Sequence, residues 1–155
     1  MSSCAGGDKA NNQETSAFVE STDLEERLIN VDPLLSSITW EGTMVGVYKH
    51  TGKVGLKKGQ LIWKGNVIVS GSVTIDMSSM TQLDTLYKTE ENKLVQHLES
   101  PDFFDVSNHP TATFEITGSD RAEKTVSGNL TIRGVANSGT VNDVVFDEAS
   151  GAAKG

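Results

Sequence analysis

Acid–base and metal chemistry in proteins relies mostly on histidine and carboxylate side chains, and this chain of 155 residues offers few of them. The candidates are His50, His97 and His109, together with Asp76, Asp102 and Asp105. No two histidines occur in an HxH, HxxxH or HExxH spacing, which would place both imidazoles on one face of a strand or helix. We therefore predict no metal site, no cofactor and no catalytic residue.

Each of these side chains has a structural explanation. His97 ends a helical pattern, where an imidazolium suits the helix dipole or makes a core hydrogen bond, and His109 precedes a proline in a turn. His50 begins a strand and is expected to be exposed. Asp76 should bind backbone amides of the loop after a strand, while Asp102 and Asp105 form turns. A Gly-x-Ser-x-Gly nucleophile elbow is also missing.

The only cysteine, Cys4, cannot form an internal disulfide. Its surroundings, Ser2 to Gly7, resemble the end of a bacterial lipoprotein signal, in which the cysteine is acylated. The following polar residues, Asp8 to Ser16, are typical of a flexible tether. We expect lipidation at Cys4, with a spare thiol on a disordered tail as the alternative. We divide the sequence into a tether, residues 1–30, and a barrel domain, residues 31–155.

The charge of the chain argues against a nucleic-acid partner. Its formal net charge is -8, whereas contact with phosphates needs clustered Lys and Arg. The nearest basic patch, Lys57, Lys58 and Lys64, is expected to be a solvated hairpin end. No apolar run approaches the roughly 20 residues of a membrane-spanning helix.

Alternating apolar residues predict the first strands. Ser36 to Met44 alternates, and His50 to Leu56 alternates again. Lys57 to Gly59 then looks like a polar turn into Gln60 to Trp63, which would make a hairpin. Upstream, Thr22 to Glu25 has a capping-box pattern, so a short helix or an extended segment precedes this region.

The longest alternating run follows a turn at Gly65. Its apolar side is expected to consist of Val67, Val69, Gly71, Val73, Ile75 and Met77, with Ile68 among the residues on the other side. A long strand with a mid-strand glycine suits the curved wall of an antiparallel barrel or sandwich.

The middle of the chain predicts a loop and a helix before the strands resume. Ser78 to Tyr87 loses the alternation, and Glu90 to Glu99 shows helical spacing that Pro101 ends. The loop after it carries Phe103 and Phe104, of which at least one should enter the core.

Three further strand patterns follow. They are Thr111 to Thr117, Val126 to Gly134, and Val141 to Phe146, the last with a bulge near Asp143. About seven strands with one helix indicate an all-β sandwich or closed barrel.

Five segments of this chain resemble the YceI-like family of lipocalin-like, polyisoprenoid-binding proteins of the bacterial envelope. They are HLESPDFFDVSNHPTATFEI, VDPLLSSITWEG, HTGKVGLKKGQL, GSVTIDMSSM and VSGNLTIRGVAN, within Asn30 to Gly155. The resemblance implies an eight-stranded antiparallel barrel around an elongated apolar cavity. The family pattern continues beyond Gly155 with further strands. We therefore expect an incomplete barrel from a fragment, with a partner, a swapped strand or the N-terminal segment covering the gap as the alternative.

The resemblance implies non-enzymatic binding of a polyisoprenoid or quinone-like lipid. From strand phase we expect the lining to be Trp40, Val54, Leu56, Val69, Val73, Ile75, Phe114, Ile116, Leu130 and Ile132. A lid would comprise Leu83, Leu86, Leu94 and Leu98. The alternatives are an envelope interaction protein with a filled barrel and, third, a hydrolase using His97 with Asp102. The expected location is the bacterial envelope, either periplasmic or anchored to the outer membrane through acylated Cys4, and both a monomer and a homodimer stay open.

Overall fold

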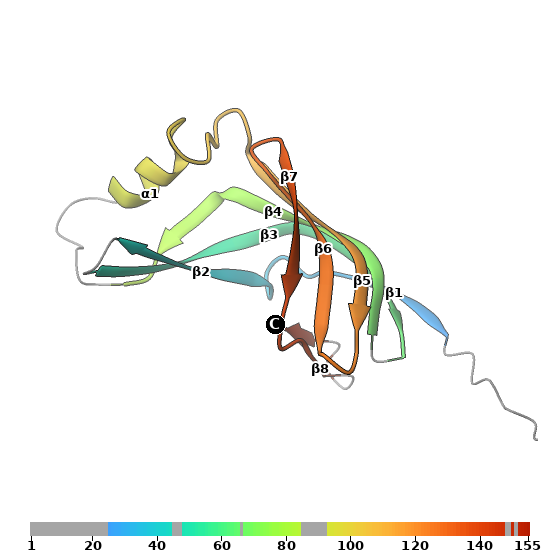
Figure 1. Cartoon of the computed structure of the whole chain (residues 1–155). Helices are drawn as coiled ribbons and strands as arrows, with labels where there is room; N and C mark the ends of the chain where they lie inside the picture. The colour runs from blue at the N-terminus through green and yellow to red at the C-terminus, as the bar shows by residue number, and fades with distance from the viewer. Residues whose placement is uncertain (1–24, 45–47, 66, 85–92, 148–149, 151) are drawn as a thin grey trace, which may run out of the picture.

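The computed structural model describes residues 25–44, 48–65, 67–84, 93–147, 150 and 152–155. Within these ranges the chain forms one long, strongly curved antiparallel sheet, a second small sheet and one short helix (Figure 1). The predicted all-β class with a single short helix is therefore confirmed.

The main sheet contains seven strands. They are β1 (Glu26–Asn30), β2 (Ser37–Met44), β3 (Tyr48–Lys64), β4 (Val67–Gln82), β5 (Thr111–Asp120), β6 (Thr125–Ile132) and β7 (Val135–Val141). The order is β1-β3-β4-β5-β6-β7, and β2 pairs with β3 beside β1. The strands curl toward a lipocalin-like barrel, but the described part of the sheet is not closed, because β7 forms one edge and β1 with β2 the other. The last two strands, β8 (Val145–Asp147) and β9 (Ala152–Lys154), pair only with each other.

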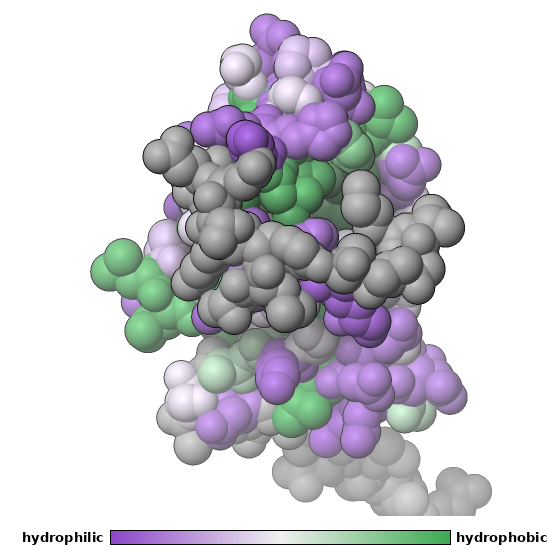
Figure 2. All heavy atoms as spheres, turned by 90° about the vertical axis from the view of Figure 1, so that its left-hand side faces the viewer, coloured by the Kyte–Doolittle hydropathy of each residue, from purple (hydrophilic) through white to green (hydrophobic). Residues whose placement is uncertain are grey.

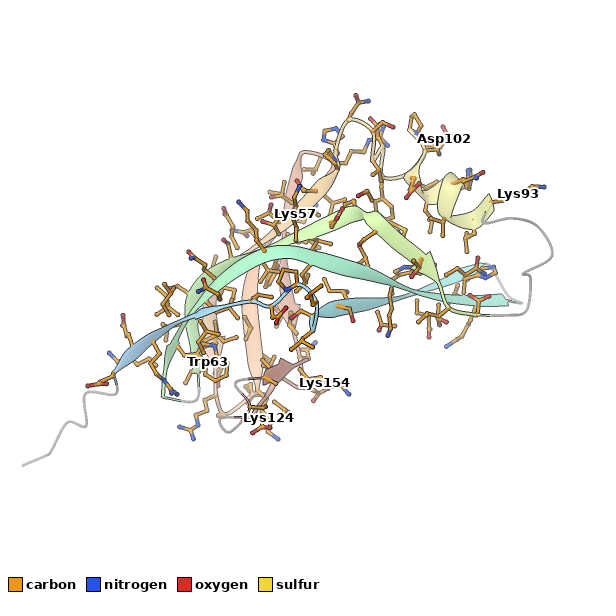
Figure 3. All side chains as sticks on the ribbon, turned by 180° about the vertical axis from the view of Figure 1, so that it is seen from behind. Lys57, Trp63, Lys93, Asp102, Lys124 and Lys154 are labelled. Atoms are coloured by element: carbon orange, nitrogen blue, oxygen red, sulfur yellow. The ribbon has the colours of Figure 1, made fainter. Side chains whose placement is uncertain are left out.

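The hairpin predicted at Lys57 to Gly59 is wrong, because β3 continues through these residues as a single strand of 17 residues. Leu56 pairs with Ile75, whereas Lys58 pairs with Thr74, so Lys57 is an extra residue on β3. Such a bulge bends a strand without ending it. The polar segment that resembled a turn is thus a bend on the solvent side of a continuous strand, and Figure 3 labels Lys57 along it.

The sequence predicted which β4 side chains face the interior. This prediction is correct in the second half of the strand and wrong in the first half. Ile62 pairs with Ser70 and Trp63 with Ile68, so Val69 is skipped in the pairing and forms a bulge. The bulge reverses the alternation, and Ile68 is 5% exposed whereas Val69 is 36% exposed. A bulge adds a residue without any compositional mark, so alternation alone could not locate it.

The region between β4 and β5 follows the prediction in part. The expected loop at Ser78 begins later, because β4 continues to Gln82. The helix α1 (Lys93–Glu99) ends before Pro101 as predicted, and residues 90–92 of the predicted helix lie outside the described part. After the helix, the N–H of Phe104 donates to the carbonyl of Leu98 at 3.0 Å, which folds the loop back on the helix.

The strand β7 was not predicted. It follows a two-residue turn in which Arg133 and Gly134 both have positive φ, of 50° and 75°. Two such residues form a type I′ turn, which suits a tight hairpin. The strand predicted from Val141 to Phe146 is therefore wrong, since Val141 ends β7 and β8 is a separate short strand. β7 is largely exposed on both faces, so it carries no apolar alternation.

Two apolar clusters lie at opposite ends of the sheet. The first contains Val54, Ile75, Met77, Met80, Val95, Val106 and Ala112, next to α1. The second contains Trp63, Ile68, Val126 and Val144. Figure 3 shows Trp63 at the end away from Lys93, the first residue of α1, and Asp102 in the loop after it. One end of the curled sheet is thus filled by its own side chains.

The N-terminal region is described only from residue 25. Glu26–Asn30 forms β1 along β3, which agrees with the extended alternative for the segment before Val31. The capping-box residues 22–24 and Cys4 lie outside the described residues.

Candidate functional site: an apolar cavity in the curled sheet

The concave side of the sheet encloses a cavity of about 940 Å³. Residues from β2 to β7, from α1 and from the loop after it border this cavity. Viewed from the end at which α1 lies, apolar atoms reach the surface between polar residues (Figure 2). This volume falls within the range of small-molecule sites and would accommodate a ligand of lipid size.

Eight of the ten residues predicted from strand phase border the cavity. They are Trp40, Val54, Leu56, Val73, Ile75, Phe114, Leu130 and Ile132. The structure places the other two elsewhere. Val69 is the exposed bulge residue of β4, and Ile116 packs against the second apolar cluster. Both residues lie on the part of the sheet near the second apolar cluster and not on the part that borders the cavity.

The helix and the double-phenylalanine loop cover part of the cavity. Leu94 and Leu98 of the predicted lid border it, together with Phe103 and Phe104. As predicted for at least one phenylalanine, Phe104 packs against the first cluster. Of the remaining lid residues, Leu83 is exposed and outside the lining, and residue 86 is not described.

His97 of α1 borders the cavity but does not form the His–Asp pair considered from the sequence. Its ring meets the ring of Phe103 edge-on, with centroids 4.7 Å apart. Asp102 is exposed, and no ion pair joins it to His97 among the described residues. The side chains near this end of the cavity therefore serve packing more than proton transfer.

The sequence predicted that His50 is exposed, but the structure shows that it is largely buried. Its side chain is 19% exposed, borders the cavity and points its Nδ1 at Asp84 Oδ1, 3.3 Å away. Gln82 Nε2 donates to the same carboxylate oxygen at 2.8 Å, and the N–H of Thr51 donates to Oδ2 at 2.9 Å. The end of β4 thus holds a carboxylate behind the imidazole.

The sequence did not indicate Asp84, which lies behind His50 and outside the cavity lining. Partial burial opposes its ionisation, but the hydrogen bonds from Thr51, Gln82 and His50 outweigh burial and lower the pKa of Asp84 below its ordinary value of 3.8. Its carboxylate is therefore ionised at neutral pH. Only the pairing of β3 with β4 brings residues 50 and 84 together, so their spacing in the sequence carried no signal.

Trp40 adds a polar atom to the lining. Its indole Nε1 is buried and has no hydrogen-bond partner among the described residues. The indole packs directly over Gly52, where an added Cβ would come within 2.2 Å of two of its ring atoms. The glycine on β3 is thus the residue that makes room for the ring.

The charges around the cavity are few. Among its described lining residues the ionisable ones are Glu41, His50 and His97, with no Lys or Arg. Glu41 forms a surface ion pair of 2.9 Å with Lys49. Across the described ranges, no three His, Cys, Asp or Glu residues lie close enough to hold a metal ion, and no helix is both long and apolar enough to cross a membrane.

An antiparallel sheet curled around an apolar cavity, with a filled end and a helix beside the cavity, defines a lipocalin-like fold with a candidate ligand site. The sequence comparison agrees with this class, since the model of the YceI-like domain matches residues 30–154, and the chain belongs to that family. The family is generally one of binding proteins and is associated with lipids. A search of curated proteins finds no match.

Proposed function

We propose that this protein binds an elongated apolar lipid, of the polyisoprenoid or quinone-like kind, without catalysing a reaction. The observation that carries the proposal is the cavity of about 940 Å³ with its aliphatic and aromatic walls. Transfer of a hydrocarbon tail from water into such a site stabilises the complex by ~25 cal/mol per Å² of apolar surface buried.

The cavity also distinguishes this proposal from its main alternative, an interaction protein with a filled barrel. Side chains fill only the end around Trp63, whereas the other end leaves space among Val73, Ile75 and Leu130. A core evolved for packing alone would close such a volume, because interiors are normally packed as densely as organic crystals.

A cavity-filling substitution tests the proposal. Val73→Trp places an indole in the open part of the cavity and is expected to lower lipid affinity at least about tenfold, a loss of about 1.4 kcal/mol. Val69→Trp is the matched control, since it changes the same residue type on the same strand at an exposed position. Native mass spectrometry of gently purified protein and equilibrium dialysis with a radiolabelled isoprenoid would measure the bound lipid.

The proposal requires the two variants to differ. Equal affinity of Val73→Trp, Val69→Trp and the parent protein would show that the lipid binds elsewhere. A lipid-free mass in every preparation, with no binding in dialysis, would favour the filled-barrel alternative.

We also propose that the protein acts in the bacterial envelope, with acylation of Cys4 as its anchor. The support is the sequence around this cysteine together with membership of the family. Expression of the complete gene with a labelled fatty acid should label the parent protein and not the Cys4→Ser variant. Label retained by the variant would remove Cys4 as the anchor site.

A further inference from the structure

The segment between β1 and β2 carries the most exposed large apolar side chains of the described residues. Leu34 is 94% exposed and Leu35 is 86% exposed, and neither borders the cavity. We propose that these leucines, together with Lys57 and Lys58 of β3, form a surface that docks on anionic lipid bilayers. The surface lies on the outside of the protein, so its docking does not require a lipid in the cavity.

The turn that carries the leucines is held by hydrogen bonds at its base. The N–H of Leu34 donates to Asp32 Oδ1 at 2.9 Å, and the N–H of Val31 donates to the carbonyl of Gly59 on β3 at 2.9 Å. The backbone is thus fixed to the sheet while the side chains of Leu34 and Leu35 face solvent. Burial of a leucine lowers the free energy, so two adjacent exposed leucines on a fixed turn favour an apolar partner.

The cations beside this turn indicate the chemistry of that partner. The ends of β1 and β2 pair with β3 on either side of residues 56–59, so the turn lies beside that stretch. Lys57, labelled in Figure 3, and Lys58 are both exposed there, and neither forms an ion pair within the described ranges. Apolar side chains next to lysines are typical of surfaces that insert into anionic bilayers.

The acidic groups of the chain do not cancel this local charge. Asp32 is the acidic residue of the turn itself, and its carboxylate already accepts the N–H of Leu34. The formal net charge of -8 is spread over the whole sequence. At physiological ionic strength, charges more than about 8 Å from a head group are largely screened, so the nearby lysines dominate the contact.

A bilayer fits this surface better than a second copy of the chain does. A stable protein interface buries roughly 800 Å² on each partner, with a matching polar rim around its apolar core. Leu34 and Leu35 at one turn supply only a small part of such an area, and two chains of net charge -8 repel each other. A bilayer needs no matching surface, because protruding side chains partition into it directly.

The position of the surface also suits the proposed function. Ile38 of β2 lies three residues after Leu35, is 37% exposed and borders the cavity. Docking through the turn therefore brings the β2 side of the cavity close to the bilayer, which is the source of an apolar ligand. Only this adjacency to the cavity rests on the proposed function; the exposed leucines and the lysines beside them do not depend on it.

Sedimentation with sucrose-loaded vesicles tests the proposal. The parent protein carries Cys4→Ser, so that an acyl chain cannot contribute to binding. We expect it to bind vesicles of phosphatidylcholine mixed with phosphatidylglycerol about threefold to tenfold more tightly than vesicles of phosphatidylcholine alone, and this preference should disappear at about 1 M salt. No binding to the anionic vesicles would overturn the proposal.

Two paired substitutions assign the residues. Leu34→Ser with Leu35→Ser removes the apolar part of the surface and should lower the affinity for anionic vesicles at least about tenfold. Lys57→Gln with Lys58→Gln should remove the preference for anionic vesicles and leave binding to phosphatidylcholine unchanged. All four side chains are exposed, so both variants should melt at the temperature of the parent.

Each pair has a matched control elsewhere on the protein. Leu83→Ser with Val135→Ser removes two other exposed apolar side chains. Lys124→Gln with Lys154→Gln removes two exposed lysines that Figure 3 shows away from Lys57. Both controls should bind the vesicles as the parent does.

The possible failures are distinguishable. Equal vesicle affinity of the leucine variant and its control would show that Leu34 and Leu35 do not dock. A parent that is dimeric in analytical ultracentrifugation, with a monomeric leucine variant, would assign these leucines to a second copy and overturn the bilayer proposal. Dialysis with an isoprenoid measures cavity binding separately, so failure of vesicle docking leaves the proposed function standing.

Discussion

Asp84 illustrates how a single side chain at the end of a strand determines the character of a cavity wall. It accepts hydrogen bonds from a backbone N–H, an amide and an imidazole, all contributed by the ends of β3 and β4. Its position helps to orient His50 at the border of the cavity. We therefore expect Asp84 to contribute to stability and to hold His50 in place.

The lowered pKa of Asp84 predicts a pH dependence. A carboxylate with a lower pKa in the folded than in the unfolded state stabilises the fold above its ordinary value of 3.8, and this contribution is lost as pH falls through the folded value. Asp84→Asn should lower the melting temperature at neutral pH, and the difference from the parent should shrink below about pH 3.8.

Thermal unfolding followed by circular dichroism between about pH 2 and pH 7 measures this difference. Asp102→Asn, at an exposed position of the loop after α1, serves as the control and should melt with the parent at every pH. A constant difference between parent and Asp84→Asn across this range would mean that the carboxylate charge plays no part.

At the level of residues, strand phase indicated which side chains face the concave side of the sheet. Alternation identified Trp40, Phe114 and Leu130 as cavity residues, because a strand with one buried face has a period of two. It did not identify His50 or Asp84, because their meeting depends on the register between two long strands, and register is set by the whole sheet.

At the level of elements, β4 depends on Gly71 as much as on its apolar residues. Gly71 has φ of 138° and lies two residues from the bulge at Val69. An added Cβ would come within 2.3 Å of the carbonyl oxygen of Gln60 on β3. The sharp turn of the wall between cavity and filled end therefore requires glycine here.

Gly71→Ala is expected to lower the free energy of unfolding by about 1–3 kcal/mol or more, because it combines an unfavourable φ with a backbone clash. Gly118→Ala on β5 is the matched control, since an added Cβ there meets nothing within 4 Å and φ is not positive. Chemical denaturation of both variants gives the comparison. Similar midpoints for the two would contradict the role of Gly71 in the bend.

The sequence predicted the existence of the helix and of several strands better than it predicted where they begin and end. The helix before Pro101 and the strands β2 and β5 follow from local patterns. The continuity of β3 through Lys57 and the presence of β7 do not, because a bulge resembles a turn in composition and an exposed strand lacks apolar alternation. In both cases pairing with a neighbouring strand, not local preference, fixes the conformation.

At the scale of the molecule, the curled sheet has a packed end and an end that contains the cavity. The filled end is built around Trp63, which is 1% exposed, while the cavity end leaves volume among its side chains. Family membership and the all-β class were both predictable from the sequence, because many separate segments resemble the family or show strand patterns. Closure into the expected eight-stranded barrel was not found in the described residues.

This division predicts that the two ends respond differently to substitution. Trp63→Ala should lower the free energy of unfolding by about 3–5 kcal/mol, since it empties a fully buried site, yet leave lipid affinity nearly unchanged at temperatures where the protein is folded. Val73→Trp should lower lipid affinity and leave the free energy of unfolding nearly unchanged. Guanidinium unfolding and lipid dialysis on both variants provide the test, and a loss of affinity in folded Trp63→Ala would show that the ends are coupled.

Phe114 borders the cavity and also packs against the cluster around Trp63, so this cluster lies next to one end of the cavity. On the proposed function, a lipid tail in the cavity can advance only until it meets this cluster, so the depth of the cavity should limit the length of tail that it buries. Tails that fit the depth bury all of their carbons, and each further prenyl unit must remain outside and adds no affinity. A series of isoprenoid alcohols should therefore show affinity that rises with length and then levels off.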